Sequence, residues 1–285
     1  MKERLKKTRS SLFLWTVFPF FFIWVSGNYL VSFRRETGWR PRNPARPALS
    51  SFSENYLVSQ PEIKPLSQIE SGLVTIWFDD GWLSQYEIAA PILARAGFPA
   101  AVSVVTDYTG YGGYLDWLQL RDLQKKGWEI TSHGVSHYCD DGQIADSQAE
   151  LEFYRSRQEL INEGFRPGHF VAPCGLISSR TGEFAQKYYR SLRTSDGGFN
   201  PLPVEEPYSL KAFGIEESTS LEEIRGWLHE AKNSRSWLIF IFHQVDKEDA
   251  RYGVAPEKFE GIITEIKSSG LSVVLPSQVL EVGNG

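Results

Sequence analysis

Short apolar runs alternate with longer amphipathic segments from residue 69 to the end of the 285-residue chain. The apolar runs have the length of buried strands, and several amphipathic segments end at a glycine, as helices do. We expect strands over residues 73–78, 100–105, 128–132, 169–172, 191–194, 210–213, 237–242 and 271–275. We expect helices over residues 86–96, 117–126, 146–163, 221–232 and 256–268. This order predicts one α/β domain with a parallel sheet, which is either a barrel or an open, doubly wound sheet.

The first 46 residues differ from the rest of the chain in charge. They hold ten Lys and Arg against two Asp and Glu, whereas the remainder holds 20 against 33. Residues 1–10 form a basic flank, and residues 11–33 carry no charge. At about 1.5 Å per residue, a helix over 11–33 is long enough to cross a bilayer. We predict a transmembrane signal-anchor at 11–33 and a Pro-rich linker at 34–68, with a signal peptide cleaved near Gly27 as the alternative.

These charges also set expectations about partners. An acidic domain of this size is poorly suited to phosphate backbones, so we expect no nucleic-acid partner. The N-terminal apolar segment predicts attachment to a membrane. Five basic residues precede that segment and five follow it by residue 46, so the positive-inside rule gives no orientation. No feature of the sequence indicates the oligomeric state.

Acidic residues and histidines follow three of the predicted strands. Asp79 and Asp80 follow the first strand, His133 and His137 the third, and His243 the seventh. Each group alone also suits an ordinary turn or polar loop. Because the carboxyl ends of parallel strands lie at one face of the sheet, we expect these side chains to gather there. Two histidines and a carboxylate are a usual ligand set for Zn²⁺, and Co²⁺, Ni²⁺ or Fe²⁺ would also fit. One carboxylate then remains as a base and one histidine as an acid.

These stretches resemble the motifs of a known family, the polysaccharide deacetylases of the NodB-homology type (carbohydrate esterase family 4). Phe78-Asp79-Asp80-Gly81 matches the first family motif, residues 132–137 match the second, and Ile241-Phe242-His243 resembles the last. The resemblance covers most of residues 69–285. It implies that this region is a catalytic domain folded as a distorted (β/α)7-type barrel.

The resemblance also implies a role for each residue of the three motifs. The first aspartate of the family's first motif is the base and the second is a metal ligand, which assigns these roles to Asp79 and Asp80. The second motif supplies two metal histidines, which are His133 and His137 here. The last motif carries the acid, and its histidine is His243.

A further stretch, residues 170–175, lies where the family has a motif that forms the wall of the substrate groove. Pro173 and Gly175 match that motif, whereas Val171 stands where many members have an arginine, and Cys174 replaces a usual aromatic residue. This form is closer to membrane-linked members, including those that act on β-1,6-linked poly-N-acetylglucosamine. Residues 173–175 are therefore expected to bind substrate.

Three other side chains are candidates for the site. Trp82 lies in the loop after the first predicted strand and is a candidate to contact substrate, with packing within the loop as the alternative. Arg193 and Lys211 are candidates for orienting the base in place of the missing arginine.

The only cysteines are Cys139 and Cys174. A disulfide, two free thiols, or a metal ligand in the case of Cys139 are all compatible with the sequence.

The sequence therefore predicts a metal-dependent hydrolase that removes N-acetyl groups from an extracytoplasmic amino-sugar polysaccharide. Poly-N-acetylglucosamine, a chitin-like polymer and peptidoglycan are the candidate substrates. The enzyme is expected to be anchored in the membrane by a single pass with its catalytic domain outside, or secreted after cleavage. The alternatives are an inactive carbohydrate-binding protein on the same barrel and an O-acetyl esterase.

Overall fold

The structure, a computed structural model, describes residues 71–140, 142–246 and 252–280. Its strands form one sheet in which every pairing is parallel, in the order β5-β4-β3-β2-β1-β7-β6, with β8 paired to β1. The strands are β1 (Leu73–Phe78), β2 (Ala101–Val104), β3 (Glu129–Ser132), β4 (His169–Val171), β5 (Ser191–Arg193), β6 (Phe213–Gly214), β7 (Trp237–Phe242) and β8 (Ser272–Val273). The predicted parallel α/β fold is confirmed.

The sheet curls until its two edges meet through one short segment of chain. Leu210 forms a parallel bridge with Arg193 on β5, and Phe213 of β6 pairs with Phe240 on β7. The predicted strand at 210–213 is therefore divided between the two edges of the sheet. Leu210 pairs with β5, and Phe213 pairs with β7. This closure favours the predicted distorted barrel over an open sheet.

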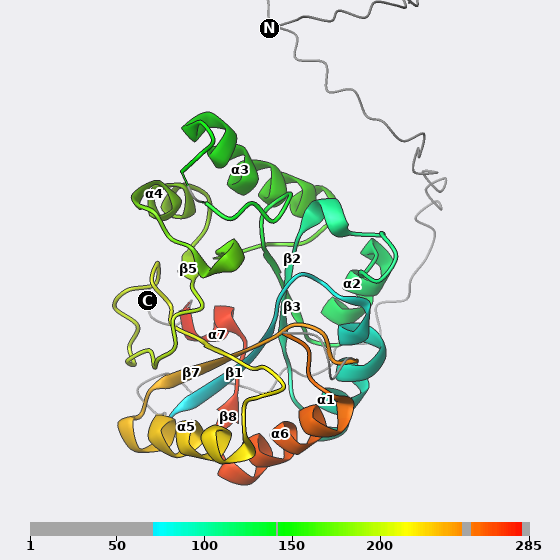
Figure 1. Cartoon of the computed structure of the whole chain (residues 1–285), viewed down its shortest axis with the longest axis vertical. Coiled ribbons are helices and arrows are strands. Elements are labelled where there is room, and N and C mark those ends of the chain that lie inside the picture. Colours follow the sequence, from blue (N-terminus) through cyan, green and yellow to red (C-terminus); the bar gives the residue numbers. More distant parts are fainter. Residues whose placement is uncertain (1–70, 141, 247–251, 281–285) are drawn as a thin grey trace, which may run out of the picture. The chain divides into compact units, whose positions relative to one another are not determined.

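Helices surround this curled sheet (Figure 1). They are α1 (Ala90–Ala96), α2 (Trp117–Lys125), α3 (Asp146–Asn162), α4 (Ser179–Tyr188), α5 (Leu221–Ser234), α6 (Pro256–Ser269) and the short α7 (Pro276–Leu280). Gly97 ends α1 in the left-handed conformation (φ 76°), as the sequence predicts. The sequence pattern did not predict α4, because Gly182 interrupts a segment with few apolar residues. A capping box between Ser178 and Thr181 starts that helix.

Alternating residues of the strands pack on opposite sides of the sheet. Val74, Ile76 and Phe78 of β1 belong to the large cluster beneath the helices, whereas Leu73 and Trp77 belong to a second cluster that also holds residues of β7. Because side chains alternate along a strand, the residue after Phe78 faces the same side as Trp77. This periodicity directs Asp79 into the interior of the curled sheet.

The predicted flank at 1–10, transmembrane segment at 11–33 and linker at 34–68 lie outside the described residues. Within the described part of the chain, no helix combines the length and apolar character needed to cross a bilayer. The predictions for the N-terminal segments remain predictions.

Candidate active site

Asp79 forms a buried ion pair with an arginine from a distant strand. The Arg193 Nη2 atom donates to Asp79 Oδ1 at 2.5 Å and to Oδ2 at 2.6 Å, and both side chains are almost fully buried. β1 and β5 are not neighbours in the sheet, so this contact crosses its interior. The guanidinium also lies over the Trp77 ring and donates to the Thr194 carbonyl. Of the two expected candidates, Arg193 reaches the carboxylate, whereas the side chain of Lys211 lies against Gly198.

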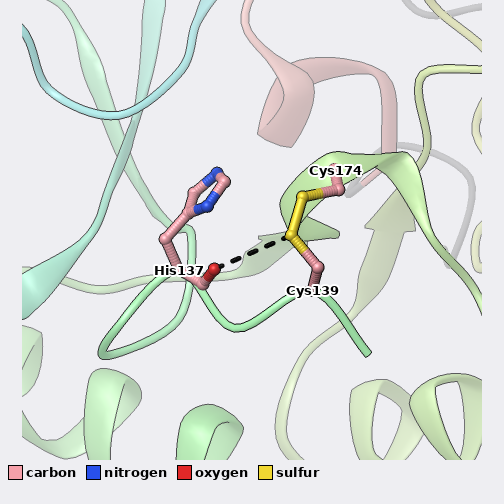
Figure 2. Close-up of side chains that lie close together, drawn as sticks. All are labelled: His137, Cys139 and Cys174. Carbon is pink, nitrogen blue, oxygen red and sulfur yellow. Dashed lines mark hydrogen bonds between the residues drawn. A yellow bond between two sulfur atoms is a disulfide. The ribbon is translucent and has the colours of Figure 1, made fainter. Parts of the chain in front are cut away.

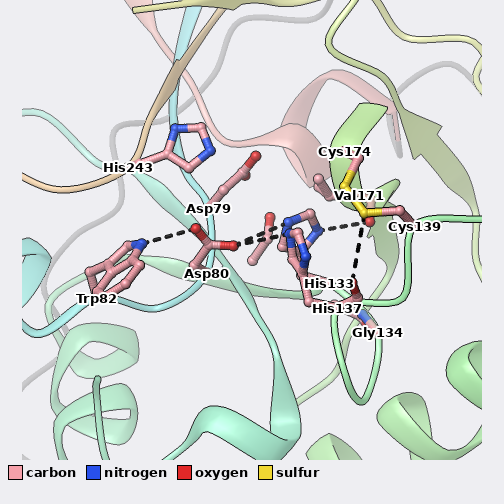
Figure 3. A network of polar contacts seen from close by, with 12 residues as sticks. Asp79, Asp80, Trp82, His133, Gly134, His137, Cys139, Val171, Cys174 and His243 are labelled. Atoms are coloured by element: carbon pink, nitrogen blue, oxygen red, sulfur yellow. Dashed lines mark hydrogen bonds and ion pairs between the residues drawn. A yellow bond between two sulfur atoms is a disulfide. The ribbon is translucent and has the colours of Figure 1, made fainter. Parts of the chain in front are cut away.

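Asp80 brings its carboxylate between two histidine rings. Asp80 Oδ1 lies 3.5 Å from His133 Nε2 and 3.4 Å from His137 Nε2. The other oxygen, Oδ2, accepts a hydrogen bond from Trp82 Nε1 at 2.9 Å. One ligand atom from each of Asp80, His133 and His137 lies within 4.8 Å of the other two. Figure 3 shows this group together with Asp79 and His243.

The hydrogen bonds of His133 show that this cluster suits a cation. His133 Nδ1 lies 2.9 Å from the carbonyl oxygen of Val171, so Nδ1 carries the proton and donates it. In the neutral ring, Nε2 then presents a lone pair to Asp80 Oδ1, which is buried and has no hydrogen-bond partner. Two acceptors that face each other need a positive charge between them. The three residues therefore fit a divalent metal, which keeps open coordination positions when it has three protein ligands.

The charges around the cluster also favour a cation. Burial lowers the pKa of His133, but Asp80 and Asp79 outweigh it and raise that pKa above its ordinary value. Burial likewise raises the pKa of Asp80, but the three histidines of the site hold it well below its usual range. Burial and His133 lower the pKa of His137, which favours the neutral ring that a metal requires. The site thus combines an ionised carboxylate with a field that attracts positive charge.

The loop after β3 is shaped by a carboxylate of α3. Glu152 Oε2 accepts hydrogen bonds from the backbone N–H groups of Val135 (2.8 Å) and Ser136 (2.9 Å), and Oε1 accepts one from Ser136 Oγ. These bonds fix the chain between His133 and His137. Glu152 was not predicted from the sequence, because glutamates on an amphipathic helix such as α3 are usually exposed to solvent.

His243 follows β7 and belongs to the same cluster of side chains (Figure 3). Its Nδ1 is buried without a hydrogen-bond partner in the described part of the chain. The side chain of Gln85 donates to the backbone carbonyls of both Asp79 (2.6 Å) and His243 (3.1 Å). Gln85 therefore ties the ends of β1 and β7 together. No motif marks this residue, although it is a fully buried polar side chain just after the first motif.

Aromatic rings line one side of the cluster formed by Asp80, His133 and His137. Trp82 stacks on Tyr114 with centroids 4.3 Å apart, and Tyr108 lies 4.9 Å from Tyr114 and 6.5 Å from His137. All of these rings except His137 come from the loops after β1 and β2. Trp82 was expected to bind substrate, and the structure additionally gives it a hydrogen bond to Asp80.

The predicted groove-wall residues form a short turn after β4. Pro173, Cys174 and Gly175 make one 3₁₀ turn, in which Cys174 has a positive φ of 59°. A side chain at position 175 would collide with Ser195, so only glycine fits there. Cys174 forms a disulfide with Cys139, whose Cα lies 5.5 Å away. The alternatives of free thiols and of a Cys139 metal ligand do not apply to this oxidised state.

Comparison with known proteins identifies a family that part of this chain resembles. Residues 68–190 match the family model for polysaccharide deacetylases. YxkH of Bacillus subtilis (strain 168), named as a polysaccharide deacetylase, is 26% identical over 127 residues, which are 44% of this chain and 45% of that protein. The match thus spans about half of the relative's length. The resemblance to polysaccharide deacetylases that the motifs predict is thus confirmed for residues 68–190.

Solved structures share the fold. The Xyl-CE4 domain of a multidomain xylanase from the hindgut metagenome of Trinervitermes trinervoides superposes with a TM-score of 0.54 at 16% identity, over 74% of this chain and 90% of that one. Peptidoglycan deacetylase PdaC from Bacillus subtilis gives a TM-score of 0.52 at 15% identity, over 75% and 93%. Arg193 and His243 lie beyond the segment that the family model matches. Their places in the site therefore rest on the geometry of this structure.

Proposed function

We propose that this chain is a metal-dependent N-deacetylase of an amino-sugar polysaccharide. The observation that carries the proposal is the convergence of Asp80, His133 and His137 on one point with an unpartnered carboxylate oxygen. Asp79 and His243 lie beside that point, which supports a base and an acid around one reacting bond. Zn²⁺ is the first choice from the ligand types, and Co²⁺, Ni²⁺ or Fe²⁺ also fit.

Each side chain then has a chemical task. A divalent metal bound to Asp80, His133 and His137 would polarise the acetyl carbonyl and acidify the attacking water. Asp79 accepts the proton of that water, and the Arg193 guanidinium holds the carboxylate in one orientation. His243 donates a proton to the nitrogen as the C–N bond breaks, because an amine anion is a very poor leaving group. The products are acetate and a free amino sugar.

The location of the enzyme is part of the proposal. We infer that residues 11–33 anchor the chain in a membrane and that the catalytic domain works outside the cytoplasm. A polymer of acetylated amino sugars is an extracytoplasmic substrate. The disulfide between Cys139 and Cys174 supports the same location, because disulfides persist in oxidising compartments.

The test is the release of acetate by the purified chain from a panel of polymers. Poly-β-1,6-N-acetylglucosamine, chitin oligomers, peptidoglycan and acetylxylan are each incubated with Zn²⁺ or with a chelator. The proposal expects metal-dependent release from at least one of the first three, lost in Asp79→Asn and kept in a control, Glu205→Gln, at an exposed acid. Release from acetylxylan alone would identify an O-acetyl esterase. No release with metal bound would favour a carbohydrate-binding protein.

A further inference from the structure

The Cys139–Cys174 disulfide lies beside one metal-binding histidine. It joins the loop after β3 to the turn after β4, and Cys139 follows His137 by two residues. The sulfur of Cys139 is 4.0 Å from the backbone carbonyl oxygen of His137 (Figure 2). The crosslink is therefore in direct contact with the backbone that presents the histidine.

His137 has a backbone conformation that its surroundings must hold. Its φ is 60°, in the left-handed region that residues with a Cβ atom seldom adopt. Such a conformation persists only where the neighbouring structure imposes it. Cys174, at the other end of the disulfide, is also left-handed, with a φ of 59°. The crosslink thus joins one left-handed residue, Cys174, to Cys139, which lies two residues after the other, His137.

The two metal histidines are anchored in different ways. His133 directly follows β3, is buried, and is fixed by the hydrogen bond from its Nδ1 to Val171. The side chain of His137 is 27% exposed, and its position depends on the loop around it. Glu152 restrains this loop before His137.

After His137, the interactions that hold the loop include the disulfide and the contacts of Asp140. Asp140 accepts hydrogen bonds from Ser178, Arg180 and Thr181 at the start of α4. Both connect the His137 loop to the segment that follows β4. The disulfide is the nearer of the two to His137, and it is the covalent one.

We propose that the Cys139–Cys174 disulfide positions His137 as a metal ligand, so that the affinity for the metal depends on the oxidation state of the two cysteines. The inference rests on the proposed metal centre. A dithiol breaks the S–S bond by donating two electrons and two protons. Each cysteine sulfur then becomes a thiol, and the dithiol becomes its own disulfide. The loop is left with one restraint fewer, and the left-handed backbone at His137 relaxes.

The expected effect is a loss of metal affinity. Groups that orient metal ligands without binding the metal typically contribute about 10- to 100-fold to its affinity. We therefore expect Zn²⁺ to bind about 10- to 100-fold more weakly to the reduced chain than to the oxidised chain. His133 and Asp80 keep their own anchors, so weak binding should persist.

The test measures Zn²⁺ affinity directly, by competition with a chromophoric chelator. The full chain is compared in its oxidised form and after reduction by a dithiol that is removed anaerobically, because dithiols bind zinc. The double variant Cys139→Ser/Cys174→Ser should match the reduced chain, and dithiol treatment should not change it further. Circular dichroism of the metal-free forms shows whether each remains folded, and the reduced wild-type chain provides the test if the variant does not fold.

Equal affinities of the oxidised and reduced chains would overturn the inference while leaving the metal centre intact. A second opposing outcome is tighter binding on reduction, with a thiolate charge-transfer band in the Co²⁺ spectrum. That outcome would make the sulfurs metal ligands, because His137, Cys139 and Cys174 also offer ligand atoms within 4.8 Å of one another. If neither form binds Zn²⁺, the proposed metal centre itself is wrong.

Discussion

Replacing Arg193 by methionine tests how much the buried ion pair with Asp79 stabilises the fold. Met keeps much of the side-chain volume but removes the charge that faces Asp79, whose side chain is 7% exposed. Removing one partner of a buried ion pair costs about 3–5 kcal/mol, because the remaining charge is left uncompensated. In a domain of about 200 residues, this loss lowers the unfolding temperature by about 6–20 °C.

The assay is thermal unfolding of the metal-free chain, with a matched surface variant. Arg95 pairs with Glu260 at 2.9 Å, but both side chains are more than half exposed, so Arg95→Met should cost about 0–1 kcal/mol. Asp79→Asn removes the buried charge, so Arg193→Met should cost about 1–3 kcal/mol less in that background. Arg193→Met should also lower the rate of acetate release, because the base loses its fixed orientation. Equal effects of Arg193→Met and Arg95→Met on stability would show that the buried ion pair contributes no more than an exposed one.

Three further predictions concern the proposed metal site and the residues beside it. Asp79→Asn should abolish acetate release but retain Zn²⁺, whereas His133→Ala should lose both, as measured by acetate assay and metal analysis. Trp82→Phe keeps the stacking on Tyr114 but loses the hydrogen bond to Asp80, so Zn²⁺ affinity should fall about tenfold in a chelator competition. In the metal-free chain, the raised pKa of His133 stabilises the fold below the ordinary histidine pKa, and this stabilisation is lost as the pH rises through the raised value. Melting temperatures of the wild type should therefore fall as the pH rises above about 6.5, with a smaller slope in His133→Ala; equal slopes would contradict this.

The features that could be predicted from the sequence are those encoded by local patterns. The apolar runs at β1 and β7 are continuous and bounded by turns, so their limits agree with the structure. The residues that follow them gather at one place, because parallel strands present their carboxyl ends together. The placement of Asp79, Asp80, His133, His137 and His243 in one cluster needed only the order of strands and the motifs.

The features that could not be predicted depend on contacts between distant residues. Arg193 and Lys211 were equivalent candidates, because the ion pair that distinguishes them crosses the interior between strands that are not neighbours. Gln85 binds the backbone carbonyls of Asp79 and His243, and His243 lies 158 residues away from Gln85, so no local pattern encodes that contact. The pairing of Cys139 with Cys174 remained open for the same reason, because a sequence does not give the distance between two loops.

The central claim is that one divalent metal, held by Asp80, His133 and His137, is needed to cleave an N-acetyl amide. The most direct test is to titrate the metal-free chain with Zn²⁺ in the presence of poly-β-1,6-N-acetylglucosamine and to measure acetate and free amine in the same samples. We predict that the two products form in equal amounts and that their rate levels off at one Zn²⁺ per chain. Full acetate release in a chelator, or acetate without amine, would contradict the central claim.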